Sequence, residues 1–379
     1  MAANAGLSNG IICTPDQYER SKTDDSIHCL TRGESIGLTI IAQAGLISLV
    51  AVSCVFVIIL RNLVWRIRHV PREKWRVFHQ PMDLLMFSLF SADVLQAIGA
   101  VMDVKWIQDG KVESGNFCNA QGIIQQLGET GVAMTTLAIA VYTFLGIWMG
   151  KGIKSIWITR AVVSLGWLFI LLMVVIGTTV KRGPGKHYES PTPYWCWISE
   201  DYLQMRIWGE YFWFWITLAF SIVIYVPLYL WSRGNIIIDN HSWWKFTFQK
   251  ASLNADPGQR GVRRRSLIML AYPLVYCVSI LPISVVRWIG FIQERNGGTS
   301  RISSTATAVV STIYGLSGVC NVILLLTTRP ESVLFGKYSN FSSGHAPPSI
   351  VSSRHDDHSS QEVLGFDKGD NELGMLPAR

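Results

Sequence analysis

Seven long stretches of this chain are almost free of charged residues, and they decide most of what it can fold into. They cover approximately residues 36–60, 82–103, 120–149, 161–180, 207–231, 267–292 and 302–328. A helix needs about 20 apolar residues to cross the hydrocarbon core of a bilayer. In lipid, a helix also satisfies its own backbone hydrogen bonds. We therefore expect an all-α membrane protein, a seven-transmembrane helix bundle over residues 36–328.

Composition supports a membrane protein over the two soluble alternatives. Only 16% of the residues are charged, whereas soluble domains usually carry about 25%. The 15 Trp and 12 Tyr suit the headgroup level of a bilayer, and a large soluble core would not need seven uncharged stretches. The net charge of +7 does not indicate a nucleic-acid partner, because the Lys and Arg residues lie in short loops between the apolar stretches. The partner we expect is membrane lipid.

The loop cations predict the orientation of the bundle. The first, third and fifth loops hold sixteen Lys and Arg residues, and the second, fourth and sixth loops hold eight. Because cytoplasmic loops are enriched in Lys and Arg, we expect the N-terminus outside the cell and the C-terminus inside, in a multi-pass protein of the plasma membrane. Residues 1–35 then form an extracellular segment without a cleaved signal. Residues 329–379 form a cytoplasmic tail, which we expect to be disordered from about residue 337 because it is polar and rich in Ser and Gly.

Four cysteines fall in segments that this orientation places outside, where disulfides persist. Cys118 lies just before the third apolar stretch, and Cys196 lies in the loop between the fourth and fifth. We expect these two to be bonded, which would hold the loop over the outer mouth of the bundle; two free thiols are the alternative. Cys13 and Cys29 are a further pair that could bond.

Polar and ionisable side chains within the apolar stretches indicate a cavity open to the outside. Gln125, Gln126 and Glu129 lie in the third stretch, Glu210 near the outer end of the fifth and Arg287 near the outer end of the sixth. Ionisable groups in a membrane are costly and usually mark function, so we expect these five to line a ligand cavity. For Glu210 and Arg287 the alternative is that each side chain extends to the membrane surface.

Asp93 lies at the centre of the second stretch and is too short to reach water. It must therefore face the bundle interior, where a buried carboxylate needs a partner. Asn321 is the one strongly polar amide in the seventh stretch, and we expect the two to form a polar switch between helices. A contact that only holds the bundle together is the alternative.

Several absences argue against enzymes and favour a receptor over a transporter. No His falls within the seven stretches, which disfavours a zinc-dependent membrane hydrolase. No phosphate-binding loop or nucleophile elbow is present, so we expect no catalytic residues, no metal and no cofactor. A transporter or channel is the alternative function, although neither repeated halves nor interrupted helices are evident in the sequence.

Three segments carry a resemblance to a known family. They are MDLLMFSLFSADVLQAIG (82–99), FCNAQGIIQQLGETGVAMTTLAIAVYTFLGIW (117–148) and GLSGVCNVILLLTTRP (315–330). In order and spacing they resemble fungal G-protein-coupled receptors of the cAMP-receptor-like and glucose-sensing groups, over about residues 36–336. The end of the third stretch, FLGIWMGKG, has no acidic-Arg pair, and the seventh ends NVILLLTTRP without an Asn-Pro-x-x-Tyr run, which distinguishes the chain from the rhodopsin-like family.

The resemblance implies two partners, a small extracellular ligand and a cytoplasmic heterotrimeric G protein. A nutrient or a cyclic nucleotide is the kind of ligand that it suggests. The long loop 232–266, with Arg263, Arg264 and Arg265, is the expected contact with the G protein. The alternative for these three arginines is that they only set the orientation of the chain.

Overall fold

The computed structural model describes residues 10, 13–24, 26–69, 78, 80–148, 155–180, 187–192, 194–233, 235–238, 246–248, 271–295 and 302–328. The chain divides into two units, Met1–Lys337 and Tyr338–Arg379. The second unit lies wholly outside the described residues, so the fold below is that of the first. The expected G-protein contact at Arg263, Arg264 and Arg265 and the tail from residue 329 also lie outside them.

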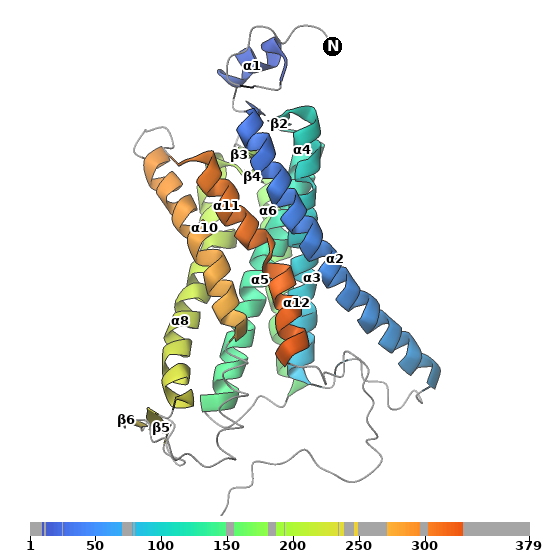
Figure 1. Ribbon diagram of the computed structural model, residues 1–379, viewed down its shortest axis with the longest axis vertical. Coiled ribbons are helices and arrows are strands. Elements are labelled where there is room, and N and C mark those ends of the chain that lie inside the picture. The colour runs from blue at the N-terminus through green and yellow to red at the C-terminus, as the bar shows by residue number, and fades with distance from the viewer. Residues whose placement is uncertain are drawn as a thin grey trace, which may run out of the picture. The chain divides into compact units, whose positions relative to one another are not determined.

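Long helices make up most of the first unit (Figure 1). They are α2 (Arg32–His69), α3 (Pro81–Val101), α5 (Asn116–Trp148), α6 (Ile156–Thr179), α8 (Phe212–Ser232), α10 (Ala271–Arg295), α11 (Ser304–Gly315) and α12 (Ser317–Thr328). The short helices are α1 (Pro15–Ser21), α4 (Asp103–Asp109), α7 (Leu203–Arg206), a 3-10 turn at Glu200–Tyr202 and a π-helical turn at Ile207–Tyr211.

Three small antiparallel strand pairs lie at the ends of the helices. They are β1 (Ile27–Cys29) with β2 (Lys111–Glu113), β3 (Glu189–Thr192) with β4 (Trp195–Ile198), and β5 (Ile236–Ile238) with β6 (Phe246–Phe248). Figure 1 shows β2, β3, β4 and the N-terminal α1 at one end of the bundle and β5 with β6 at the opposite end. We call the first the outer end and the second the inner end, names that follow the orientation predicted from the loop cations.

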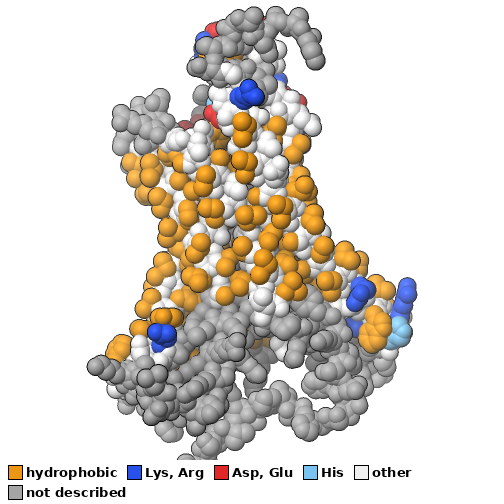
Figure 2. Space-filling model, viewed as in Figure 1, with side chains coloured by type: hydrophobic (Ala, Val, Ile, Leu, Met, Phe, Trp, Pro, Cys, Tyr) orange, Lys and Arg blue, Asp and Glu red, His pale blue; other side chains and the backbone are white. Residues whose placement is uncertain are grey.

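The helices have the length and surface of membrane spans. Among the described residues, six helical segments are long and apolar enough to cross a bilayer, and a shorter apolar stretch, Leu274–Gly290, lies in α10. Figure 2 shows a broad band of hydrophobic side chains across the middle of the visible face of the bundle, with the visible charged side chains toward its two ends. A soluble protein would not leave such a belt in water, so the chain is a helical membrane protein.

The helices form a closed ring around α5. Helix α2 packs against α3 on one side and against α11 and α12 on the other, while α10 lies between α11 and α8. Helix α5 contacts α3, α6, α8 and α10, so its side chains face the interior along much of its length. This position explains why the polar residues of α5 end up buried.

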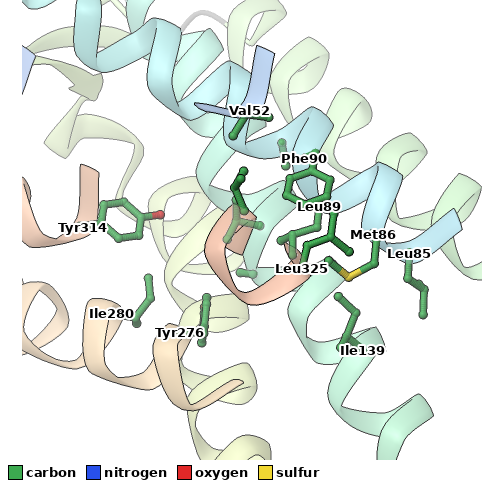
Figure 3. Close-up of a cluster of buried hydrophobic side chains, with 14 of the residues drawn as sticks. Val52, Leu85, Met86, Leu89, Phe90, Ile139, Tyr276, Ile280, Tyr314 and Leu325 are labelled. Carbon is green, nitrogen blue, oxygen red and sulfur yellow. The ribbon is translucent and has the colours of Figure 1, made fainter. Parts of the chain in front are cut away.

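Glycine on α5 permits the closest helix contact in the bundle. A Cβ placed on Gly128 would collide with the backbone of Gln96 on α3, and one on Gly131 would lie 2.9 Å from the Cβ of Ala92. The two backbones therefore approach more closely than larger side chains would allow, as small residues permit in membrane bundles. Below this contact, apolar side chains from α2, α3, α5, α10 and α12 fill the inner half (Figure 3).

The structure corrects three expectations about helix limits. Helix α2 continues to His69, so Arg61, Arg66 and Arg68 lie on a helix and not in a loop. At about 1.5 Å per residue, its 38 residues exceed a bilayer core of about 30 Å, and Arg favours helix once the chain has left the lipid.

The other two corrections concern interrupted helices, which the sequence did not reveal. The fifth stretch begins with the π-helical turn Ile207–Tyr211 before α8. The seventh is divided at Leu316 into α11 and α12. Both interruptions lie beside the polar residues described below, where hydrogen bonds from other helices compete with the regular helix.

Candidate functional site

The outer end of the bundle is closed by the β3–β4 hairpin, which a disulfide attaches to α5. The predicted bond between Cys118 and Cys196 is confirmed, with Cα atoms 5.2 Å apart. Cys13 and Cys29 are also bonded, 5.8 Å apart between Cα atoms. Cys118 and Cys196 are both fully buried, so the hairpin is packed onto the bundle and forms a lid over its interior.

Gln121 on α5 holds this lid to the adjacent helices. Its Oε1 accepts hydrogen bonds from the Trp106 indole, at 2.6 Å, and from the Cys196 backbone N–H, at 3.2 Å. Its Nε2 donates to Asp103 at 2.6 Å. Sequence analysis did not select Gln121 or Asp103 as site residues. Their signal was only that both are polar residues near the outer ends of apolar stretches.

Beneath the lid, three predicted cavity residues meet in an ion cluster. The Arg287 guanidinium lies 3.7 Å from the Glu129 carboxylate and 3.8 Å from that of Glu210. The Glu210 side chain is 0% exposed and that of Arg287 is 15% exposed, so neither extends to the membrane surface. The alternative that sequence analysis left open for these two residues is therefore wrong.

In this cluster two buried carboxylates, those of Glu129 and Glu210, share the single guanidinium of Arg287. Both pair distances exceed hydrogen-bond length. Neither oxygen of Glu210 has a hydrogen-bond partner among the described residues. Arg287 also stacks on the Trp197 ring of the lid, 4.4 Å from its centroid, a cation–π contact. The cluster thus joins α5, α10, the π-helical turn before α8 and the lid through interactions that leave hydrogen-bonding capacity unused.

Gln125 and Gln126, the remaining predicted residues, occupy different positions. Gln125 packs its side chain on Gly99 of α3 and lines the same cavity as Glu129. Gln126 accepts a hydrogen bond from the Tyr188 hydroxyl at 3.3 Å and therefore supports the lid. Of the five predicted cavity residues, Gln125, Glu129 and Arg287 line one or both of the two cavities described next, whereas Gln126 and Glu210 line neither of them.

Sequence analysis missed two ionisable residues of this region, Glu189 and Arg206. Glu189 comes from β3 of the lid, is buried and packs its carboxylate on Gly122 of α5. Burial raises the pKa of Glu189 to about 8, and the positive charge of Arg206 opposes that rise. In sequence both residues resemble ordinary loop charges, because nothing in a loop reveals which side chain will be folded under it.

Two cavities meet at Arg287. The outer cavity has a volume of about 270 Å³ and lies between the lid, α7, the π-helical turn, α10 and α11, with Trp195, Trp197, Tyr211 and the two arginines in its wall. The inner cavity, of about 30 Å³, continues downward past Glu129, Gln125 and Tyr314 to Asp93. The inner cavity has room for about two water molecules by volume. Ser311, Trp195 and Ile283 also line both.

At the bottom of the inner cavity, Asp93 and Asn321 form the predicted contact. The Asn321 amide donates a hydrogen bond of 2.9 Å to Asp93 Oδ2, and both residues are buried. The other Asp93 oxygen has no hydrogen-bond partner among the described residues. The contact itself is confirmed, whereas its role as a switch stays a prediction.

The interruption of the seventh stretch lies beside this pair. The Ser48 hydroxyl of α2 donates to the Gly315 carbonyl at 2.6 Å, and the Gln96 amide of α3 donates to the Tyr314 carbonyl at 3.3 Å. Backbone carbonyls at the junction of α11 and α12 are therefore satisfied by other helices, as a broken membrane helix requires. Helices α2 and α3 hold this junction directly above the Asp93–Asn321 pair.

The fold and the site together define a multi-pass helical membrane protein with a lidded outer cavity and a buried polar centre. Comparison with known proteins adds no narrower class, because no protein-family model matches the chain and no curated protein matches it significantly.

Proposed function

We propose that this protein is a seven-helix receptor of the plasma membrane, which senses a small extracellular ligand and activates a heterotrimeric G protein. The observation that carries the proposal is the continuous line of buried polar residues between the outer cavity and the centre of the bundle. It runs from Arg287 and Glu129 through the inner cavity to Asp93 and Asn321. A stable bundle has no need of such a costly line, but a receptor needs a physical link between ligand and helix movement.

A ligand in the outer cavity would act on this line at Arg287. A ligand group that attracts the Arg287 guanidinium changes its distances to Glu129 on α5 and to Glu210 in the π-helical turn before α8. Ser311 and Tyr314 of α11 border the same space. Because a ligand shifts a conformational equilibrium by its preference for one state, this convergence couples α5, α8, α10 and α11 to occupancy.

Two observations support seven spans and an external N-terminus. Helix α10 has 25 residues, contains the apolar stretch Leu274–Gly290 and packs between α8 and α11. Both disulfides lie at the end that also carries the N-terminal α1 (Figure 1). Since disulfides persist outside the cytosol, that end faces outward in the proposal.

The proposal that the protein activates a G protein rests on the resemblance to fungal receptors and on the cationic loop 232–266. A direct test uses the purified full chain in lipid nanodiscs with a panel of purified heterotrimeric G proteins, and measures GTP exchange against a panel of nutrients, nucleotides and lipids. The proposal expects GTP exchange above the empty-nanodisc level with at least one combination of G protein and compound. That exchange should be lost after Arg287→Ala. Exchange that never exceeds the empty-nanodisc level contradicts the proposal.

A transporter is the second candidate, favoured by one observation. The short interruption at Leu316, where backbone carbonyls accept hydrogen bonds from side chains of α2 and α3, lies near a buried carboxylate. Transporters bind substrates at interrupted helices near the midplane. Uptake of the same compounds into liposomes that contain the protein separates the two functions. Saturable uptake without GTP exchange favours the transporter, and exchange without uptake favours the receptor.

A further inference from the structure

A third cavity opens from the outer cavity toward the lipid. It is a cleft between α2 and α11, of about 340 Å³, whose wall includes Gly33, Ile36, Ile40, Val309 and Ile313. The four larger residues of this set are all at least 40% exposed and lie on helices that span the membrane. We call this space the α2–α11 cleft. Its contents would therefore be in contact with the lipid of the outer half of the bilayer.

The α2–α11 cleft and the outer cavity share part of their walls. Tyr194, Trp195 and Thr307 line both. The cleft wall is apolar apart from a few hydroxyl groups and Glu34, whereas the outer cavity contains Arg206 and Arg287. One continuous site therefore has an apolar arm against the lipid and a polar arm inside the bundle. Ligand pockets usually measure about 300–1,000 Å³, and the two arms together fall in that range.

The charges of the polar arm select the head group. Arg287 faces Glu129 and Glu210 at 3.7 and 3.8 Å, and the charge of Arg206 acts on the buried Glu189. Both arginines of the outer cavity are therefore already matched by buried carboxylates, and a charged head group of either sign would lack a free counter-charge. Arg287 Nη1, a donor, and Glu129 Oε2, an acceptor, are buried without hydrogen-bond partners among the described residues, as is the Ser311 hydroxyl. A neutral hydroxyl group both donates and accepts, and it satisfies such a mixed set at no electrostatic cost.

We infer that the site binds a single-chain lipid with a neutral, hydroxyl-bearing head, with its acyl chain in the α2–α11 cleft and its head at Arg287 and Ser311. The inference rests on the proposed function only in taking the outer cavity as the ligand site. In this inference the ligand reaches the site from the outer leaflet of the bilayer, through the α2–α11 cleft, and not from the water outside the cell. The lid then needs no opening for the ligand to enter.

Binding of radiolabelled 1-oleoylglycerol to the full chain in nanodiscs tests the inference, with empty nanodiscs as the background. Gly33→Phe adds a ring at the cleft wall, where a Cβ at Gly33 would meet no atom within 4 Å. Gly146→Phe on α5 is the matched control, since Gly146 is equally open and lines neither cavity. We expect saturable binding that Gly33→Phe weakens at least tenfold and Gly146→Phe leaves unchanged.

The head group is tested by Ser311→Ala and by competition. Removing one hydrogen bond in a buried site costs about 1 kcal/mol, so Ser311→Ala should weaken binding about fivefold while the thermal midpoint stays near that of wild type. Methyl oleate and free glycerol should not compete, because each lacks one arm. Binding no better than empty nanodiscs, equal effects of the two Phe variants, or stronger competition by oleate or a sterol than by 1-oleoylglycerol would each overturn the inference. None of these results depends on a G protein, so their failure leaves the receptor proposal standing.

Discussion

Asp93 illustrates how a single residue in a membrane helix restricts the structure around it. A carboxylate at the centre of a helix must face the interior and find a donor, and few donors exist in apolar stretches. That scarcity made Asn321 predictable as its partner, and the hydrogen bond of 2.9 Å confirms it. Glu129, Glu210 and Arg287 were expected to line one cavity because ionisable groups in a membrane are costly, and the structure places them in one ion cluster.

Asp93→Asn tests whether the pair is a switch. The variant keeps the size and hydrogen bonding of the side chain but removes its charge, so we expect normal surface level and altered basal GTP exchange, by about threefold or more in either direction. Surface labelling and GTP exchange, measured together, check this. Asn321→Ala should change exchange in the same direction. Wild-type surface level and wild-type exchange in Asp93→Asn would show that the contact has no switching role.

Glu189 predicts a pH dependence of stability. Burial raises the pKa of its carboxyl from the ordinary value of 4.5 to about 8, against the opposing charge of Arg206, so the folded state holds the proton more tightly than the unfolded state. The Glu189 carboxyl therefore leaves the free energy of unfolding unchanged below about pH 4.5. It lowers that free energy progressively as the pH rises toward 8. Each pKa unit corresponds to about 1.4 kcal/mol, so the penalty is on the order of a few kcal/mol.

Glu189→Gln removes that penalty. Thermal unfolding of the purified protein between pH 5 and 8.5 should show a midpoint that falls with pH in the wild type and falls less in the variant, with a gain of several degrees at pH 8. The exposed acid Glu200 offers a control, because Glu200→Gln should follow the wild-type curve. Identical curves for Glu189→Gln and wild type would mean that the lid carboxylate is solvated.

At the scale of helices and strands, the positions of small residues explain the helix packing better than the pattern of hydrophobic residues does. The sequence predicted each apolar stretch, but not that the seventh is divided at Leu316, because the division depends on Ser48 and Gln96 from other helices. Gly315 and Gly318 on either side weaken a helix, yet glycine is also common within intact membrane helices. The buried positions of Glu189 and Arg206 were unpredictable for a similar reason, since the fold of the lid alone decides them.

The contact of α3 with α5 predicts a difference between two glycines on one helix. Gly128→Ala forces a methyl group against the Gln96 backbone, whereas Gly146→Ala adds one in open space. Overpacking typically costs about 1–3 kcal/mol, and alanine in an open helical position gains up to about 1 kcal/mol. The yield and thermal midpoint of purified Gly128→Ala should fall while those of Gly146→Ala hold or rise. Equal behaviour of the two variants would show that α3 and α5 do not meet closely at Gly128.

The bond between Cys118 and Cys196 is the covalent link between lid and bundle. It joins residues 78 apart in sequence, and closing a loop of that length stabilises a fold by about 4 kcal/mol in the chain-entropy model. Cys118→Ser should therefore reduce surface expression severalfold by flow cytometry. The free cysteine Cys54 is exposed on α2, and Cys54→Ser should express normally. Wild-type surface levels of Cys118→Ser would mean that the lid packs without the bond.

For the whole molecule, the decisive feature is the number of membrane crossings. Six spans meet the length and composition expected of a membrane helix, and α10 supplies the seventh in our account, although it carries Arg287 within its apolar stretch. That arginine places the ion cluster at the outer cavity. The proposed ligand site therefore depends on α10.

Epitope accessibility at the two ends of the chain tests this account most directly. Tags are placed before Met1 and after Arg379 of the full chain, and antibody labelling is measured in intact and in permeabilised cells. Seven spans with an external N-terminus predict that the first tag is labelled on intact cells and the second only after permeabilisation. Labelling of both tags on the same side would give an even number of spans and would contradict the receptor topology.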